Sequence, residues 1–241
     1  MTIAAAPETL AVLVTGATGP SGRAVARRFA ADGARVALNG SDAGRLAGVV
    51  GSLGLGADRV IAVPGDLTDP EAARAVVATV EAAFGRIDVL VHLVGGWTGG
   101  TAVADLDHAE VRSMLDQHLW TTLNTLQAVL PGMASRGFGR VVAVSSPLAT
   151  TPGPRGASYA MAKAAEEVLL RSVARETAAD GVTANILVIR TLDDERSRAA
   201  QPKAKTAGWT TPEELADAIA WLASPAAAAV NGQRIPLDGR G

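Results

Sequence analysis

Residues 10–22 read LAVLVTGATGPSG, and this segment sets a pattern that the rest of the chain repeats. Residues 10–15 are an apolar run typical of a buried strand, and residues 23–31 have the pattern of a helix. Between them lies a turn with glycines at 16, 19 and 22. This context fits a phosphate-binding fingerprint, because the backbone can approach a pyrophosphate at the helix N-terminus. It also fits a plain strand-to-helix connection, so both interpretations stay open.

Strand and helix patterns alternate along the chain. Apolar runs typical of strands lie at residues 35–38, 60–63, 89–94, 141–144, 182–189 and 234–237. Helical patterns lie at residues 70–84, 106–135 and 158–179, and Thr211 is placed to cap a further helix. The long helix is predicted to break near Gln117 and His118. Strands that are apolar throughout are typical of parallel sheets covered on both faces. The alternation predicts an α/β fold, a Rossmann-type doubly wound parallel sheet of about seven strands.

Composition narrows the classes of function. The chain has 241 residues and a net charge of −2, which argues against nucleic-acid binding. It has no cysteine, which argues against disulfides and thiolate metal sites. No apolar run reaches the roughly 18 residues of a membrane span, and residues 1–7 do not resemble a signal peptide. We expect a cytoplasmic protein without metal, membrane or nucleic-acid partners. We expect a single domain over residues 1–241, with a substrate loop at residues 191–210, which lack periodicity.

The single tyrosine, Tyr159, precedes Lys163 by about one helical turn, so both side chains are predicted to share one helix face. A nearby ammonium favours the phenolate, so we expect the pKa of Tyr159 to lie below its usual value of about 10. Such a phenol could exchange a proton near neutral pH. A half-buried tyrosine beside a solvated lysine is the alternative interpretation of this pair alone.

These features together resemble the short-chain dehydrogenase/reductase family over essentially the whole chain. The matching residues are the turn at 15–22, Asp66, Gly95, Ser146, Tyr159, Lys163, Asn185 and the closing segment 231–239. The resemblance implies an NAD(P)(H)-dependent oxidoreductase that interconverts carbonyl and alcohol by hydride transfer. Tyr159 would then be the general acid and base, Ser146 would orient the carbonyl oxygen, and Lys163 would hold the nicotinamide ribose.

The resemblance also implies which residues contact the cofactor and substrate. Cofactor contacts are expected from Gly16, Thr18, Gly19, Pro20, Ser21, Gly22, Asn39, Ser41, Asp66, Leu67, Val94, Gly95, Tyr159, Lys163, Thr191 and Leu192. An acid at position 40 would favour NAD(H), and this position is glycine, so NADP(H) is the expected cofactor and NAD(H) the alternative. Trp97, Pro147 and Trp209 are expected to shape the pocket for a small-molecule carbonyl or alcohol substrate. Family members are commonly oligomers, which implies a homodimer or homotetramer.

The chain departs from the family's usual residues at several places. Pro20 stands where the main branch has glycine, His92 and His118 stand where the family has asparagines, and residues 189–190 replace the usual Pro-Gly. His118 is expected either to make a structural hydrogen bond or to join the proton relay behind Lys163, since its ordinary pKa of about 6.5 suits a relay. These departures keep two alternatives open: a dinucleotide-binding sensor without turnover, and a reductase of C=N or C=C bonds.

Overall fold

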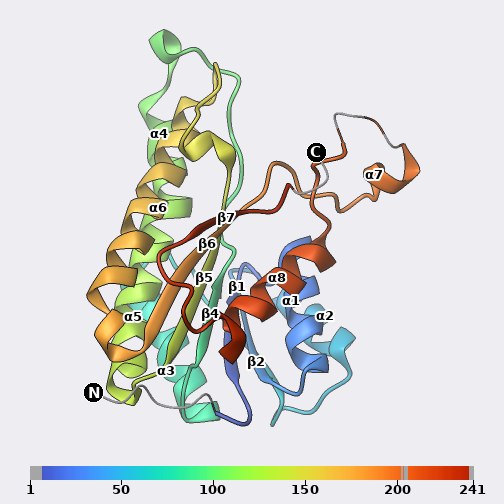
Figure 1. The fold of residues 1–241 in the computed structure, drawn as a ribbon, viewed down its shortest axis with the longest axis vertical. Coiled ribbons are helices and arrows are strands. Elements are labelled where there is room, and N and C mark those ends of the chain that lie inside the picture. Colours follow the sequence, from blue (N-terminus) through green and yellow to red (C-terminus); the bar gives the residue numbers. More distant parts are fainter. Residues whose placement is uncertain (1–6, 202, 204–205, 239–241) are drawn as a thin grey trace.

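A parallel sheet forms the centre of the molecule (Figure 1). The computed structural model describes residues 7–201, 203 and 206–238. The sheet has seven strands in the order β3-β2-β1-β4-β5-β6-β7, and all neighbouring strands are parallel. They are β1 (Ala11–Thr15), β2 (Arg35–Gly40), β3 (Val60–Pro64), β4 (Val89–His92), β5 (Gly139–Ser145), β6 (Val182–Val188) and β7 (Arg234–Pro236). The predicted doubly wound sheet is confirmed, and its strand order reverses between β1 and β4, the place where such sheets bind ligands.

Helices cover both faces of the sheet (Figure 1). The first face carries α1 (Pro20–Ala31), α2 (Ala43–Leu53) and α8 (Pro212–Ala223). The second face carries α3 (Pro70–Phe84), α5 (Thr121–Arg136) and α6 (Ala157–Glu176), and α4 (His108–Leu115) contacts α6. Short 3-10 turns lie at Val103–Asp105, Pro147–Ala149, Ala178–Asp180 and Pro225–Ala227.

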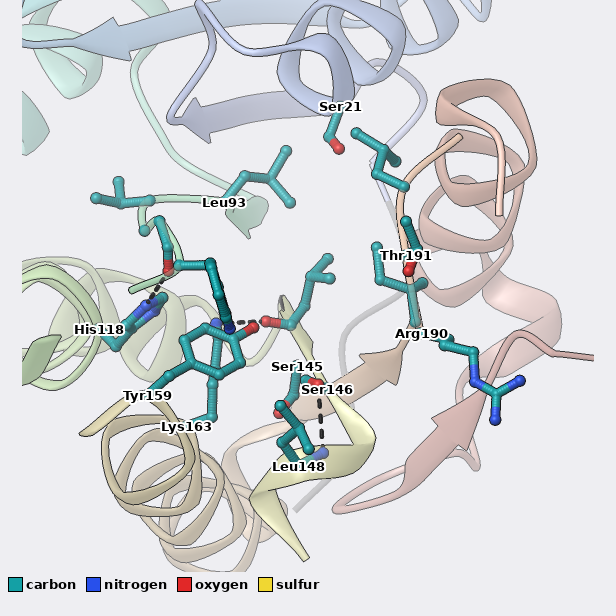
Figure 2. A pocket seen from close by; sticks show the side chains of 17 residues that line it. Ser21, Leu93, His118, Ser145, Ser146, Leu148, Tyr159, Lys163, Arg190 and Thr191 are labelled. Carbon is teal, nitrogen blue, oxygen red and sulfur yellow. Dashed lines mark hydrogen bonds between the residues drawn. The ribbon is translucent and has the colours of Figure 1, made fainter. Parts of the chain in front are cut away.

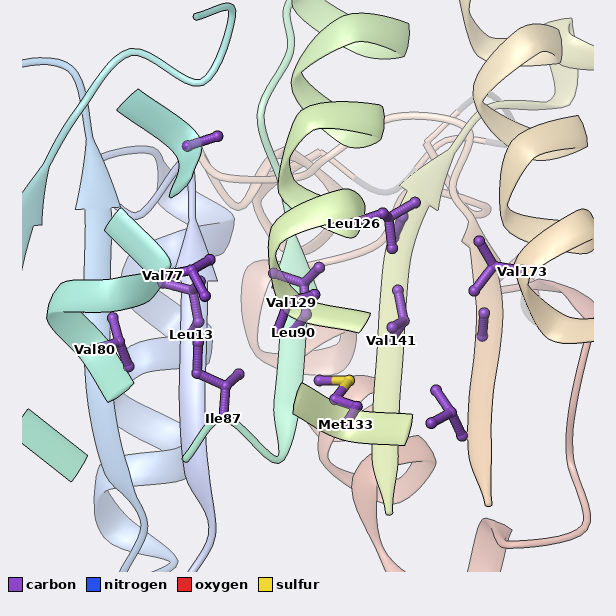
Figure 3. Packing of buried hydrophobic residues seen from close by; sticks show 14 of the residues in the cluster. Leu13, Val77, Val80, Ile87, Leu90, Leu126, Val129, Met133, Val141 and Val173 are labelled. Atoms are coloured by element: carbon purple, nitrogen blue, oxygen red, sulfur yellow. The ribbon is translucent and has the colours of Figure 1, made fainter. Parts of the chain in front are cut away.

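The side chains of β1 show how the sheet supports two cores. Leu13 is fully buried against the second helix layer, with Leu90, Leu126 and Val141 in the same cluster (Figure 3). Its neighbours Val12 and Val14 are buried in the other cluster, beneath the first helix layer. Successive strand residues point to opposite faces, so a continuous apolar run fills both cores. Each fully buried side chain of this size contributes about 1.5–3 kcal/mol.

Capping residues place the helix starts where the sequence predicts them. The side chain of Asp69 accepts the amide of Glu71, and Pro70 occupies the first turn of α3. Thr211 and Glu214 form a reciprocal capping box at the start of α8. Helix α2 begins after Asp42, a residue type that favours helix starts, and its carboxylate accepts the amide of Arg45.

The predicted break in the long helix is a π-helical segment, Asp116–Trp120, between α4 and α5. A π turn inserts an extra residue, which rotates the following side chains relative to a regular helix. His118 lies in this segment and is buried, facing α6. The segment therefore turns a histidine toward the helix that carries Tyr159.

Residues 191–210 are tied to the body of the protein at several points. Leu192 and Thr210 form an isolated parallel bridge, and α7 (Ser197–Ala200) lies between them. The carboxylate of Asp193 accepts the amides of Ser197 and Arg198, and Arg198 binds both carboxylate oxygens of Glu214 on α8. The bond with Arg198 lowers the pKa of Glu214 to about 2. Positions 202 and 204–205 of this loop, and position 239 of the closing segment, lie outside the described residues.

A membrane-spanning helix is not found in the part of the chain that the structure describes, since none of its helices is both sufficiently long and sufficiently apolar.

Candidate active site

A cavity of about 440 Å³ opens at the carboxyl ends of β4, β5 and β6. Figure 2 shows Tyr159, Lys163 and His118 on one side of it, with Ser21 and Thr191 opposite. Ser146 follows β5 directly and also lines the cavity. The four residues predicted to be catalytic therefore meet in one place, although they come from three parts of the chain: the end of β5, the π-helical segment and α6.

Tyr159 and Lys163 lie on the same side of α6, as their spacing predicts (Figure 2). Tyr159 is partly exposed to the cavity, whereas Lys163 is buried. The interpretation of Lys163 as a solvated surface lysine is therefore wrong. Its ammonium donates to the carbonyl of Val144 at 2.7 Å, which anchors it to the end of β5.

The expected direction of the Tyr159 pKa shift is wrong for this structure. Burial raises the pKa of the Tyr159 phenol above 10, and the positive charge of Lys163 lowers it by less. The negative charge of Glu166 raises the pKa further, and a hydrogen bond with Ser146 lowers it. Tyr159 is therefore a protonated phenol at neutral pH, which is the form that a general acid requires.

Glu166, one turn beyond Lys163, was not singled out from the sequence. Its carboxylate accepts a hydrogen bond from the Lys163 ammonium at 2.7 Å and is 1% exposed. The hydroxyl of Thr122 lies 3.3 Å from its other oxygen. Burial raises the pKa of Glu166, and Lys163 and Thr122 oppose that rise. Acidic residues on helices are usually solvated, so the burial of this ion pair is revealed only by the π-helical segment and Thr122, which pack against α6.

His118 packs against the loop that follows β4. One ring nitrogen, Nε2, lies 2.9 Å from the carbonyl of Gly96 and must donate to it, because a carbonyl only accepts. Burial lowers the pKa of His118 to about 3, with Lys163 lowering it further, so the ring is neutral. The ring also lies edge-on to Tyr159, with centroids 5.4 Å apart. The structural hydrogen bond is therefore present, while a relay role for His118 stays a prediction.

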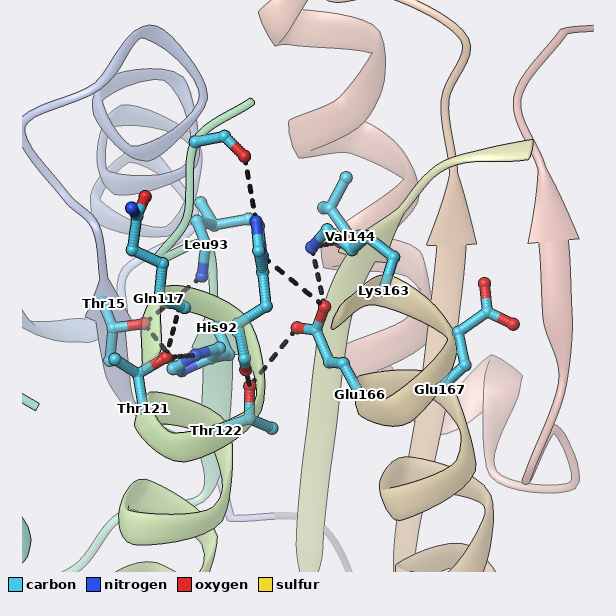
Figure 4. A network of polar contacts seen from close by, with 12 residues as sticks. Thr15, His92, Leu93, Gln117, Thr121, Thr122, Val144, Lys163, Glu166 and Glu167 are labelled. Atoms are coloured by element: carbon cyan, nitrogen blue, oxygen red, sulfur yellow. Dashed lines mark hydrogen bonds and ion pairs between the residues drawn. The ribbon is translucent and has the colours of Figure 1, made fainter. Parts of the chain in front are cut away.

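His92 has a packing role. It is fully buried between the hydroxyls of Thr15 and Thr121, at 3.0 and 3.3 Å. Burial lowers its pKa to about 3, so it bridges β1, β4 and α5 as a neutral ring. Figure 4 shows His92 beside the cluster that contains Lys163 and Glu166.

The glycine turn borders a second cavity of about 340 Å³, lined by Gly16, Thr18, Gly19, Asn39, Gly40, Ser41, Asp66, Leu67, Val94 and Gly95 among others. Leu93, Val94 and Gly95 line both cavities, so the two lie next to each other along one edge of the sheet. Together they make an elongated site that crosses the point where the strand order reverses.

The turn has room for a phosphate group. A Cβ on Gly19 would have only the carbonyl oxygen of Gly16 nearby, at 3.6 Å, so this glycine borders open space. Gly16 has a φ of 64°, and a Cβ there would collide with the carbonyl of Leu93. Gly22 brings α1 close beneath the turn. The first amides of a helix lack intrahelical partners and favour an anion, although Pro20 contributes none to this set. The turn thus fits the diphosphate of a dinucleotide.

Several residues that are predicted to contact the cofactor line the two cavities. Thr191, Leu192 and Ser21 line the first cavity. Asn39 borders the second cavity, but its amide donates to the carbonyls of Val63 and Gly65, so its side chain is engaged within the protein.

The substrate pocket is lined differently from the prediction. Trp97 borders the first cavity and is 65% exposed, so it lies at the rim. Leu148, rather than Pro147, lines the cavity, because Pro147 begins a 3-10 turn and is exposed. Trp209 lines a separate cavity with Arg198 and Glu214, because the loop that carries it is tied to α8. Among the described residues, no group of three or more potential metal ligands is found.

Comparisons with known proteins agree with this geometry. A family model described as enoyl-(acyl carrier protein) reductase matches residues 16–239. The chain is 37% identical over 237 residues to the "(2S)-[(R)-hydroxy(phenyl)methyl]succinyl-CoA dehydrogenase subunit BbsC" of Thauera aromatica, covering 94% of this chain and 92% of that protein. It is 31% identical over 238 residues to the "3-oxoacyl-[acyl-carrier-protein] reductase FabG" of Vibrio cholerae, covering 94% and 95%.

Solved structures show the same likeness. A short-chain type dehydrogenase/reductase from Mycobacterium ulcerans superposes with a TM-score of 0.87 at 28% identity, covering 95% of this chain and 88% of that one. The seven-stranded parallel sheet flanked by helices agrees with these matches. The chain belongs to the short-chain dehydrogenase/reductase family of NAD(P)-dependent oxidoreductases.

Proposed function

We propose that Tyr159 is the general acid and base that interconverts a carbonyl and a secondary alcohol in this protein. The observation that carries the proposal is the placement of the Tyr159 phenol, which faces the cavity together with Ser146 and Lys163. A donor with a pKa above neutrality is suited to protonate an oxygen on which negative charge develops. The alternative of a sensor without turnover is not favoured by relatives that are named as dehydrogenases and reductases.

Each polar group at the cavity has a separate task in this proposal. Ser146 orients the substrate oxygen, and its own oxygen is held in place by the amide of Leu148 at 3.3 Å. Tyr159 gives its proton to that oxygen during reduction and takes one back during oxidation. Lys163 holds the ribose hydroxyls and keeps its charge near Tyr159. The nicotinamide cofactor, when bound, supplies or accepts the hydride.

The residues that would hold the cofactor divide between the two cavities. The turn from Gly16 to Gly22 would hold the diphosphate, and Asp66 and Leu67 would contact the adenine. Thr191 and Leu192 would border the nicotinamide end, together with Val94 and Gly95. This division follows from the elongated shape of the site.

We infer that the substrate is an oxoacyl or hydroxyacyl group carried on a thioester, as the names of two relatives state for those proteins. The wide opening beside the exposed Trp97 suits a substrate of which only the reacting end enters the cavity. A panel of 3-oxoacyl, enoyl and simple ketone substrates, each with NADPH and NADH, tests the proposal. Turnover of the enoyl thioester alone would show that a C=C bond is the target and would overturn it.

The cofactor preference is the first prediction. NADPH is expected to bind more tightly than NADH by about 1–2 kcal/mol, because no acid at position 40 repels the 2′-phosphate and Ser41 can donate to it. The difference is modest because Ser41 carries no positive charge. Isothermal titration with both cofactors measures it, and tighter binding of NADH would contradict the preference.

Two glycine substitutions should separate cofactor binding from folding. Gly19→Ala is expected to weaken cofactor binding at least tenfold with little loss of stability, since the new methyl group enters open space. Gly95→Ala is expected to cost roughly 1–3 kcal/mol of stability, because Gly95 has a φ of 143° and a methyl group would collide with the His118 ring. Denaturant unfolding and cofactor titration of both variants measure this contrast. Equal effects of the two variants on stability would contradict it.

We further infer a homo-oligomer, either a dimer or a tetramer, that works in the cytoplasm. Met161 and Val168 on α6 are 46% and 56% exposed, and Trp120 nearby is 46% exposed. Apolar side chains gathered on an outer helix layer are typical of a subunit interface. Sedimentation equilibrium and cell fractionation test these two inferences.

A further inference from the structure

The carboxylate of Glu166 lies beside the ammonium of Lys163 (Figure 4), and Lys163 lines the cavity whereas Glu166 does not. It receives a hydrogen bond from Lys163 at 2.7 Å, and both side chains are nearly inaccessible to solvent, at 1% and 7%. Lys163 also donates to the carbonyl of Val144. The Lys163 ammonium therefore donates to both Glu166 and Val144, which fixes its orientation. Its remaining N–H is free to bind another acceptor.

The surroundings of Glu166 make Lys163 its main partner. His118 Nδ1 lies 4.0 Å from the carboxylate, but the ring is neutral and its hydrogen is on Nε2. Within the described residues, Nδ1 has no hydrogen-bond partner. Thr122 has a single hydroxyl hydrogen, which both the carbonyl of His118 and the carboxylate of Glu166 can accept. Lys163 is therefore the one cation that balances Glu166 in the described part of the chain.

The neighbouring acid, Glu167, is engaged elsewhere. Its carboxylate pairs with Arg234 at 3.0 Å and with Arg171 at 3.4 Å, and it points away from Lys163 in Figure 4. Two acids of equal burial therefore lie side by side on α6, and only one of them faces the catalytic lysine.

We propose that Glu166 is a positioning residue that holds Lys163 in place and offsets part of its charge at Tyr159, so that the phenolate form of Tyr159, which alcohol oxidation requires, appears only at more alkaline pH. The proposal rests on the function proposed above for Tyr159. A lysine charge alone stabilises a phenolate, and a carboxylate at 2.7 Å from that lysine cancels much of its field.

The charged and titratable groups facing Glu166 agree with this role. Lys163 and Glu167 lie on α6, and His118 faces it from the π-helical segment. Tyr159 lies on the same helix, and the negative charge of Glu166 raises the pKa of its phenol while the positive charge of Lys163 lowers it.

The substitution Glu166→Gln tests the proposal directly, because Tyr159 is the only tyrosine in the chain. The substitution removes the charge but keeps the size, and the new amide keeps an oxygen that can accept from the Lys163 ammonium. Ultraviolet titration of the free protein should show the apparent pKa of Tyr159 falling by roughly one unit, the direction expected when a nearby anion is removed. The pH profile of alcohol oxidation should move to lower pH by the same amount.

Glu167→Gln is the matched control, and its tyrosine titration should follow that of the wild type. If Glu166→Gln folds poorly, Glu166→Asp keeps the charge, draws it back from Lys163 and should give a smaller shift in the same direction. A phenol that titrates as in the wild type in both variants of Glu166 would overturn the proposal. The titration uses no substrate, so this result would leave the catalytic role of Tyr159 to be judged by turnover alone.

Discussion

Tyr159→Phe should lower turnover by a factor on the order of 10² or more, because it removes the acidic hydrogen and keeps the ring. Affinity for the cofactor should change little, since the glycine turn and Lys163 are left intact. The edge-on contact of the ring with His118 is also kept, so stability should stay close to that of the wild type. Steady-state kinetics on an accepted ketone, cofactor titration and thermal unfolding measure the three quantities.

The same variant provides its own spectroscopic control. Because the chain has no other tyrosine, the phenolate absorbance at alkaline pH should disappear entirely. In the wild type, alcohol oxidation should rise with pH until the phenol titrates, since the base form is needed in that direction and burial holds its pKa above 10. A Tyr159→Phe variant as active as the wild type would show that Tyr159 is not the general acid.

Lys163→Met should have the second large effect, on stability as well as on turnover. The carboxylate of Glu166 would be left buried without a cation, which typically costs about 3–5 kcal/mol. Turnover should fall on the order of 10²-fold or more, since the group proposed to hold the ribose is lost. Denaturant unfolding at several pH values measures the stability.

The pH dependence of that variant has a definite sign. Without Lys163, burial raises the folded-state pKa of Glu166 above its unfolded value of about 4.3. The folded state then binds more protons than the unfolded state, so stability is retained at acidic pH and is lost as pH rises through the folded-state pKa. Lys163→Met should therefore be more stable near pH 5 than near pH 8.

The double variant Lys163→Met/Glu166→Gln separates the two roles of the lysine. It leaves no buried charge at this position, so most of the lost stability and the pH dependence should be recovered. Turnover should stay low, because no ammonium remains beside Tyr159. A double variant as unstable as Lys163→Met would show that the buried carboxylate is not the cause.

The residues that the sequence predicted well are those whose roles are local. Asp69 and Pro70 start a helix through their own hydrogen bond and fixed φ, and Gly16 satisfies a left-handed backbone. Tyr159 and Lys163 lie one turn apart on α6, so their common direction follows from helix geometry alone. Such features need no knowledge of which elements pack together.

What the sequence could not predict depends on contacts between distant elements. Glu166 looks like an ordinary helix acid until α5 brings Thr122 and the π-helical segment brings His118 beside it. The pKa of Tyr159 was expected to fall because the charge of Lys163 was given more weight than burial, and Glu166 was not considered. Trp209 was assigned to the substrate pocket, whereas its loop is tied to α8 and carries it into another cavity.

The attachment of residues 191–210 to α8 has a consequence for protein engineering. Glu214 both caps α8 and binds Arg198 of the loop, so one acid serves the helix and the segment at once. The loop and α8 therefore form one structural unit that should be replaced together. A chimaera that imports a relative's loop while keeping the native helix would leave Glu214 without its guanidinium partner. To exchange substrate specificity with a relative, the whole segment from Leu192 to the end of α8 is best replaced together.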